Sequence, residues 1–368
     1  MKYYFINIRS LIRHILPNGS ISRNAVLVVI GDGITFTTTI LISMILARII
    51  TLDDMATYRQ VIYLGTMALT IVEFGLSSSI YRFWNLLDDC GRSTYIKMQL
   101  SLSMGLGLLA SIPLFILSPF LANIFHNPDL KIALWICAAS PLVNIVPMTI
   151  RPVMICRGKP LTATFTQMLF SMAMVLAIII PLAMGTKLTT ALVIWMIVNV
   201  IEVGLTFLIL RQEFLPNTPW WDKDKFKETW NYLWPIQAGR LPGILTSNVD
   251  KISTSIFLST EAFAAYSTGA RELPFIGTIG PSVSSVLIPS LVDDAEAGNV
   301  SSICRRWKSA CEKSSIFTYP IVGFCIWFAL PIVTFLFSSK YADSAIPFAV
   351  FSSITFIRVI EFGSLAKA

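Results

Sequence analysis

The chain has 368 residues, of which 55% are hydrophobic and 13% are charged, and its formal net charge is +7. Soluble domains are closer to a quarter charged, so this composition excludes an ordinary soluble globular protein. The apolar residues are gathered in blocks of roughly twenty, the length that a helix needs to cross a bilayer. Unbroken apolar runs such as 174–184 exclude a transmembrane barrel, whose strands alternate in polarity. The composition therefore predicts an all-α integral membrane protein.

The N-terminal segment, residues 1–24, mixes aromatic and aliphatic residues with Lys2, Arg9 and Arg13. This mixture is typical of a basic helix that lies in the membrane interface. The segment lacks a short apolar core followed by a small-residue cleavage site, so we expect no cleaved signal peptide.

About ten candidate membrane spans follow, with boundaries accurate to about four residues. They are residues 25–49, 60–80, 98–122, 130–150, 161–184, 188–210, 232–258, 263–290, 314–337 and 344–366. The connection at 211–231 is longer than most and carries tryptophan and lysine residues, so we expect a surface loop there. It divides the chain into an N-terminal six-helix lobe at 25–210, a cytoplasmic linker at 211–231 and a C-terminal lobe at 232–368.

Most lysine and arginine residues fall in loops on one side of these spans. By the positive-inside rule this side is cytoplasmic, so we predict a multi-pass protein with a cytoplasmic N-terminus. Because the positive charge is a topology signal, no nucleic-acid partner is predicted. His14, His126 and the six cysteines do not fall at metal-binding spacing, and Gly-rich phosphate loops are absent from the sequence. We therefore predict no metal, no cofactor and no catalytic residue.

A weak internal repeat underlies the spans. Residues 53–58, after the first span, are similar to residues 261–266, after the seventh, and Gly31 aligns with Gly239 at the same offset. Six spans per repeat is an even number, so both repeats have the same orientation. Parallel repeats of this kind are a transporter architecture.

Three segments carry a family resemblance. Residues 248–252 (NVDKI), 258–267 (LSTEAFAAYS) and 284–291 (SSVLIPSL) resemble the Wzx-type O-antigen and polysaccharide flippases. These form the polysaccharide transporter branch of the multidrug, oligosaccharidyl-lipid and polysaccharide exporter superfamily. The resemblance implies two parallel-repeat lobes of six helices around a central cavity. Since about ten spans are present, we expect the C-terminal lobe to be incomplete, with about four helices, and truncated.

The same resemblance implies the activity. Such proteins move undecaprenyl-diphosphate-linked oligosaccharide, an O-antigen or other surface polysaccharide repeat unit, across the bacterial inner membrane. The implied partners are this lipid-linked substrate, membrane lipids, a polysaccharide polymerase and a chain-length regulator. A transporter of this kind serves lipopolysaccharide and polysaccharide biosynthesis without being an enzyme.

Four cations within the predicted spans are the candidates to bind the diphosphate: Arg240, Lys251, Arg271 and Arg358. Arginine forms bidentate bonds to phosphate oxygens, and lysine supplies a point charge. Internal ion pairs, such as Asp250 with Arg271, are the structural alternative.

Three acids are candidate gating or coupling residues: Asp32, Glu73 and Asp250. Asp32 and Arg240 occupy equivalent positions in the two repeats, so we hypothesise that they pair across the cavity floor. The alternative is that each is satisfied within its own lobe. Gly239, Pro242 and Gly243 form a candidate hinge, since proline flanked by glycines bends a helix. A kink that only fits the neighbouring helices is the alternative there.

The main rival function is a cation-coupled multidrug antiporter of the same superfamily, in which Asp32 and Glu73 would bind protons or sodium. The intramembrane cations argue against a site for cationic drugs. A membrane-embedded glycosyltransferase or polymerase would need a sizeable polar loop, and the predicted periplasmic loops are too short for one.

Overall fold

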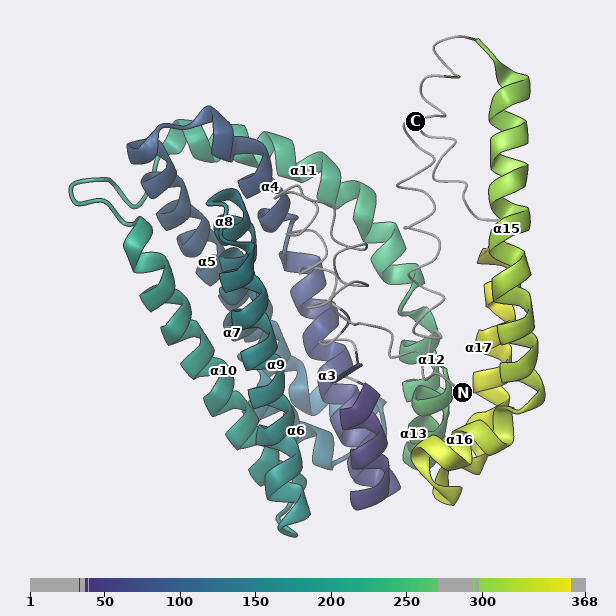
Figure 1. The fold of residues 1–368 in the computed structure, drawn as a ribbon. Coiled ribbons are helices and arrows are strands. Elements are labelled where there is room, and N and C mark those ends of the chain that lie inside the picture. The colour runs from purple at the N-terminus through teal and green to yellow at the C-terminus, as the bar shows by residue number, and fades with distance from the viewer. Residues whose placement is uncertain (1–32, 34–36, 39, 271–293, 295–297, 359–368) are drawn as a thin grey trace, which may run out of the picture. The chain divides into compact units, whose positions relative to one another are not determined.

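The computed structural model describes residues 33, 37–38, 40–270, 294 and 298–358, and within these ranges the chain folds into helices without strands (Figure 1). The first described helix is the apolar segment Ile40–Ile49. The labelled helices are α3 (Leu52–Val72), α4 (Leu76–Phe83), α5 (Asp89–Ile124), α6 (Asp129–Cys137), α7 (Ser140–Ile145), α8 (Ile150–Cys156), α9 (Pro160–Ala183), α10 (Leu188–Leu210), α11 (Lys223–Thr246), α12 (Val249–Phe257), α13 (Thr260–Gly269), α15 (Val300–Trp327), α16 (Ala329–Phe337) and α17 (Ala345–Arg358). Short 3-10 turns lie at Trp84–Leu86, Pro147–Thr149, Arg211–Glu213 and Ser339–Ser344. The predicted all-α class is confirmed.

Among the described residues, 5 helical stretches are long and apolar enough to cross a membrane. They are Leu52–Leu86, Asp89–Ile124, Asp129–Cys156, Pro160–Ala183 and Leu188–Glu213, and they correspond to the predicted spans from 60–80 to 188–210. The pair α15 and α16, bent by 77°, would make a sixth as a single broken span. The predicted spans at 25–49 and 263–290 fall partly outside the described residues, as does the end of the span at 344–366.

The predicted span at 232–258 differs from the structure. It is divided at Ser247 and Asn248 into α11 and α12, and α11 begins at Lys223, inside the predicted linker. The cause of this early start is Asp222, whose Oδ1 accepts hydrogen bonds from the backbone N–H of Asp224 (3.0 Å) and Lys225 (3.1 Å). This is the N-cap arrangement that satisfies the free N–H groups of a first helical turn.

The described chain groups into two compact units. The first comprises the described residues up to Ile42 together with Thr57–Phe257, and the second comprises Ser43–Ala56 and the described residues from Leu258 onward. Helices α11 and α12 therefore belong to the first unit. The lobe boundary predicted at 211–231 remains a prediction.

The first unit is a packed helical bundle, in which α9 runs beside α10 and α5 packs against α6 and α7 (Figure 1). Gly107 of α5 permits one of these close approaches, because a Cβ atom there would lie 2.6 Å from Leu142 Cα. Small residues at such positions let helices in a membrane come close together. Buried Ile96, Met98 and Val153 fill the interior of this bundle.

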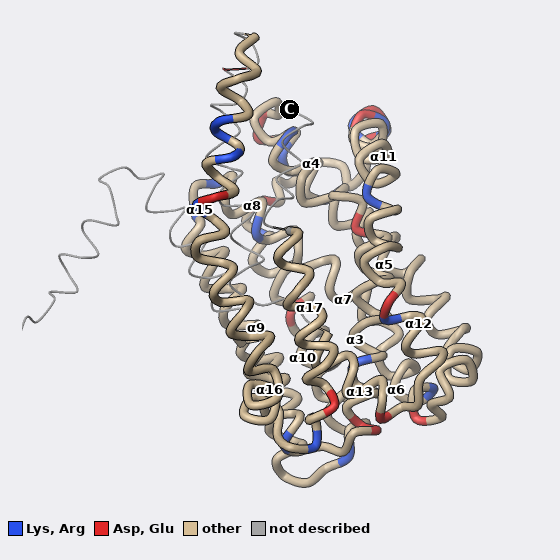
Figure 2. The backbone as a smooth tube through the Cα atoms, turned by 90° about the vertical axis from the view of Figure 1, so that its right-hand side faces the viewer, with Lys and Arg blue, Asp and Glu red and all other residues tan. Residues whose placement is uncertain are grey.

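The outward surfaces of α9 and α10 are apolar. Phe165 is 68% exposed and Leu208 is 61% exposed, and α9 contains no Lys, Arg, Asp or Glu, the residues that Figure 2 colours along the backbone. Large exposed apolar surfaces on helices of this length are those that contact lipid. This pattern agrees with a membrane protein.

The second unit packs α17 against α13, α15 and α16. Gly269 ends α13 directly against the Ser344 carbonyl, where a Cβ atom would overlap the oxygen. Ser344 Oγ in turn donates to the Ala265 carbonyl at 2.6 Å. The repeat segment at 261–266 lies in α13, whose N-cap, Ser259, accepts from Ala262 N at 3.3 Å.

Candidate functional site

Helix α3 is interrupted before α4 at Glu73, Phe74 and Gly75. Phe74 has φ of 50° and Gly75 has φ of 71°, so the chain leaves the right-handed helix at both residues. Such a break frees backbone carbonyls at the end of α3. The Gln237 side chain of α11 satisfies them, since its Nε2 donates to the Ile71 carbonyl at 2.7 Å and approaches the Thr70 carbonyl at 3.4 Å.

An ion pair and an aromatic stack accompany this hydrogen bond. Arg240 Nη1 lies 3.3 Å from Glu73 Oε2, and the ring centroid of Phe74 lies 5.2 Å from that of Trp230 and 6.1 Å from that of Trp234. We call Glu73, Phe74, Trp230, Gln237 and Arg240 the break clamp. Its α11 members are spaced by seven and three residues and share one helix face.

Arg240 therefore pairs with Glu73 in the described structure. Asp32, its hypothesised partner, lies outside the described residues, so that pairing remains a prediction. By the predicted bounds Glu73 lies in the N-terminal lobe and Arg240 in the C-terminal lobe, so this pair is not the alternative within one lobe either, and that alternative also remains a prediction.

The other predicted cations differ in their surroundings. Lys251 Nζ lies 3.6 Å from Asp250 Oδ1 and 3.3 Å from the Ser247 carbonyl. Arg271 lies outside the described residues. Arg358 is the last residue of α17, and its side chain is outside the described part. Phosphate binding by these residues remains a prediction.

The predicted hinge lies within a continuous helix. Gly239, Pro242 and Gly243 all fall inside α11, which runs from Lys223 to Thr246 without interruption. The chain is therefore not broken at this point, and bending there during transport remains a prediction.

A pocket of about 620 Å³ lies within the first unit, among α4, α7, α8, α9 and α10. Its lining residues are Ser77, Tyr81, Asn144, Pro147, Met148, Ile150, Arg151, Pro152, Ala163, Thr166, Gln167, Phe170, Ser171, Met174, Trp195, Asn199 and Glu202. The α9 residues recur every three or four positions and form one stripe, which extends for about 16 Å at the rise of an α-helix. The pocket is therefore an elongated slot along α9 and α10.

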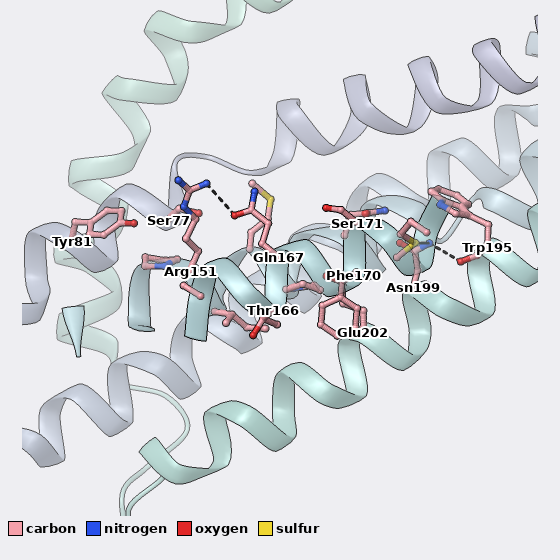
Figure 3. Close-up of a pocket in the computed structure, with 17 residues that line it drawn as sticks. Ser77, Tyr81, Arg151, Thr166, Gln167, Phe170, Ser171, Trp195, Asn199 and Glu202 are labelled. Carbon is pink, nitrogen blue, oxygen red and sulfur yellow. Dashed lines mark hydrogen bonds between the residues drawn. The ribbon is translucent and has the colours of Figure 1, made fainter. Parts of the chain in front are cut away.

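The two ends of this slot differ in chemistry (Figure 3). At one end Arg151 of α8 donates from Nη1 to Gln167 Oε1 at 3.4 Å, near Ser77 and Tyr81. At the other end Asn199 lies beside Trp195 and Ser171. Hydrogen-bond donors dominate the first end, and an amide and an indole dominate the second.

Asn199 is fully buried in this pocket. Its Nδ2 donates to the Trp195 carbonyl at 2.7 Å and contacts Met174 Sδ at 3.3 Å. Its Oδ1 receives no hydrogen bond from any group in the described part of the chain. Glu202 lies one turn further along α10, and no ion pair links its carboxylate to a cation among the described residues. The pocket thus holds two acceptors that could accept hydrogen bonds from a ligand.

The sequence-based predictions assign no role in binding to two of these residues. Arg151 follows the predicted span at 130–150 and so counts there only as a loop charge that sets the topology, whereas the structure places it inside α8 and against the pocket. Glu202 lies within the predicted span at 188–210, and no role is predicted for it. The signal that indicates both is the helical spacing of polar residues in apolar spans: Gln167 in α9 and Asn199 with Glu202 in α10.

Asp222, which lies outside the spans, has a lowered pKa. The chief cause is the hydrogen bond from the backbone N–H of Lys225, and the Lys225 ammonium, 3.5 Å from Asp222 Oδ2, adds to it. Both interactions favour the ionised carboxylate. The charge on Asp222 therefore supports the start of α11, the helix that contributes three residues to the break clamp.

Comparisons with known proteins add family and fold. A family model described as "Polysaccharide biosynthesis protein" matches residues 45–346. The structure is similar to an inward-facing multidrug resistance MATE family transporter of the MOP superfamily, with a TM-score of 0.65 and 13% identity over 92% of this chain and 85% of that chain. It is also similar to the lipid II flippase MurJ in an inward closed conformation, with a TM-score of 0.66 and 14% identity over 91% of this chain and 76% of that chain. A comparison with curated protein sequences found no match.

Proposed function

Given that the chain belongs to the polysaccharide biosynthesis protein family, we propose that it is a flippase for undecaprenyl-diphosphate-linked oligosaccharide. It would move an O-antigen or other surface polysaccharide repeat unit across the bacterial inner membrane by alternating access. The family match and the shared fold confirm the resemblance to Wzx-type polysaccharide flippases. Both the family and the fold point to a transporter rather than to an enzyme.

The observation that carries this proposal is the family match on a MurJ-like fold. A fold alone does not specify a substrate, because MATE transporters share it. The family adds polysaccharide biosynthesis, and membrane-spanning helices with lipid-facing apolar surfaces suit a substrate whose lipid part stays in the bilayer.

The pocket of the first unit supports the same proposal. Arg151 lines it from α8, and a guanidinium suits the oxygens of a phosphate. The predicted cations Arg240 and Lys251 each lie beside an acid, so Arg151 joins them as a further candidate for binding the diphosphate.

The test is genetic complementation in the host. Deletion of the gene should abolish surface polysaccharide, and expression of the open reading frame that contains this chain should restore it, measured by gel analysis of the surface glycan. Normal glycan in the deletion strain, or a deletion phenotype that the wild-type gene does not reverse, would contradict the proposal. A catalytic-site mutant of an unrelated glycosyltransferase of the same pathway serves as a control for loss of glycan.

The second candidate is a cation-coupled multidrug antiporter. The observations that favour it are the MATE fold and the Glu202 carboxylate in the pocket. In that case the deletion strain should become sensitive to cationic drugs while its surface glycan stays normal. Drug susceptibility and glycan display, measured on the same strains, distinguish the two functions.

We also carry forward two proposals from the sequence. The N-terminus would lie on the cytoplasmic side, and a polysaccharide polymerase and a chain-length regulator would be the protein partners. Fusion of a periplasm-active reporter to residue 1 tests the first, and crosslinking in intact cells tests the second.

A further inference from the structure

The Asn199 end of the pocket is built to accept hydrogen bonds. Asn199 is fully buried, and its Oδ1 has no donor in the described part of the chain. Leaving a buried acceptor unsatisfied is costly, so such atoms in native structures call for an explanation. Because the oxygen belongs to a residue that lines a pocket, a ligand donor is the explanation that the geometry offers.

The neighbouring groups specify the kind of donor. Glu202, one helical turn from Asn199, adds carboxylate oxygens, and Trp195, one turn away in the other direction, adds an indole. Ser171 faces them from α9 (Figure 3). A sugar ring matches this set, since its hydroxyls donate to amide and carboxylate oxygens and its C–H face packs on an aromatic ring.

The Arg151 end of the pocket favours a different chemical group from the Asn199 end. Arg151 favours an anion, whereas Glu202 would repel one, so a phosphate is placed at the Arg151 end and not beside Glu202. A cavity of about 620 Å³ lies within the usual range for ligand sites. A ligand with a phosphate at one end and a sugar at the other matches the slot in both polarity and size.

We propose that this pocket is a glycosyl phosphate subsite within the first unit, with the phosphate at Arg151 and the first sugar at Asn199, Glu202 and Trp195. The inference rests on the proposed function, which supplies a substrate containing a sugar linked to a diphosphate. It goes further by assigning the two chemical parts of that substrate to two named ends of one pocket.

The test is binding to the purified chain in detergent, measured by calorimetry with three probes: inorganic pyrophosphate, farnesyl diphosphate, and farnesyl diphosphate carrying a hexose or an N-acetylhexosamine. We expect at least one glycosylated probe to bind more tightly than farnesyl diphosphate. Equal binding of all glycosylated and unglycosylated probes would overturn the sugar subsite. Equal binding of pyrophosphate and farnesyl diphosphate would identify a site for free phosphate rather than for a lipid-linked one, and would overturn the assignment to the lipid-linked substrate.

Two substitutions distinguish the roles of the two ends of the pocket. Arg151→Gln should weaken all phosphate-bearing probes by about tenfold, the loss expected for one charge-assisted hydrogen bond. Asn199→Leu should weaken only the glycosylated probe and bring it to the affinity of farnesyl diphosphate. An equal effect of Asn199→Leu on both lipid probes, or none on either, would contradict the proposal.

Matched controls exclude general effects of charge and of folding. Lys159→Gln removes a positive charge from the exposed residue that precedes α9, outside the pocket lining. Thr206→Val removes a buried polar atom from α10, again outside the lining. Both variants should bind every probe as the wild type does, and thermal unfolding in detergent checks that every variant is folded at the temperature of the binding measurement.

The outcome also separates this inference from the proposed function. If the cells lack flippase activity while the probes bind as described, the proposed function fails and the subsite stands. If the wild-type gene restores surface glycan and Asn199→Leu restores it equally well at low expression, the subsite fails and the proposed function stands.

Discussion

The break clamp and the pocket both place polar groups among the apolar helices of the first unit. They differ in whether the charged groups have partners within the protein. In the clamp, Glu73 faces Arg240 and the freed carbonyls of α3 accept from Gln237. In the pocket, Asn199 Oδ1 has no donor and Glu202 has no cation partner within the described part of the chain. The contrast lies in the charges, because Gln237 Oε1 in the clamp also receives no hydrogen bond among the described residues. A paired charge stabilises a fold, whereas a buried charge without a partner costs stability and calls for an explanation. The contrast separates structural charges from functional ones.

The largest expected effect follows from removing the pocket cation. Arg151→Gln should reduce transport of the lipid-linked substrate by about tenfold or more, because the phosphate loses a charge-assisted hydrogen bond. The temperature of unfolding should stay close to that of the wild type, because the glutamine amide keeps a donor for the Gln167 side chain. Glycan display at low expression and thermal unfolding in detergent measure the two quantities. A large loss of stability with retained transport would assign Arg151 to the structural class.

The same substitution in the clamp should act in the opposite way. Arg240→Gln leaves the Glu73 carboxylate, whose side chain is 11% exposed, without its cation. We expect the free energy of unfolding to fall by about 1–2 kcal/mol. This is less than the cost of breaking a fully buried ion pair, because Arg240 is half-exposed. Adding Glu73→Gln should recover part of this loss, and the double-mutant cycle gives the coupling. Additive losses would show that the ion pair contributes nothing to the clamp.

A smaller effect of reversed sign is expected at Asn199. Asn199→Leu removes the unsatisfied buried acceptor, so the free energy of unfolding should rise or stay the same, by up to about 1 kcal/mol. Transport should fall in the same variant, since the sugar loses its partner. Thermal unfolding and glycan display again measure both. A destabilised variant would show that the amide holds α9 and α10 together through Met174 rather than awaiting a ligand.

The smallest effect concerns the cap of the clamp helix. The pKa of Asp222 is lowered below its ordinary value of 3.8, so its contribution to stability is complete above that value and is lost as the pH falls through the lower pKa of the folded state. Asp222→Asn keeps a good N-cap without the charge. The variant should match the wild type near neutral pH and lose less stability on acidification, followed by thermal unfolding at a series of pH values. Identical acid profiles would contradict this role of the carboxylate.

Much of the fold is readable from composition and periodicity. Apolar blocks of membrane length correspond to α9 and α10 within a residue, because each helix satisfies its own backbone in a lipid environment and needs few tertiary contacts to exist. The end of α5 is also matched closely, but α5 begins at Asp89, well before the predicted span at 98–122. The break between α3 and α4 was not predicted. Its left-handed residues include Phe74, a residue type without an intrinsic preference for that conformation, so Gly75 was the only local signal.

The sequence by itself determined an all-α membrane protein, its family and the rarity of the charges within its spans. It could not decide which of those charges are paired. Glu73 and Arg240 are far apart along the chain, and only the packing of α11 against the helix break brings them together. Arg151 looked like a loop charge until α8 placed it against α9 and α10. Whether a polar group is satisfied or free for a ligand depends on its neighbours in space, and these are set by tertiary packing.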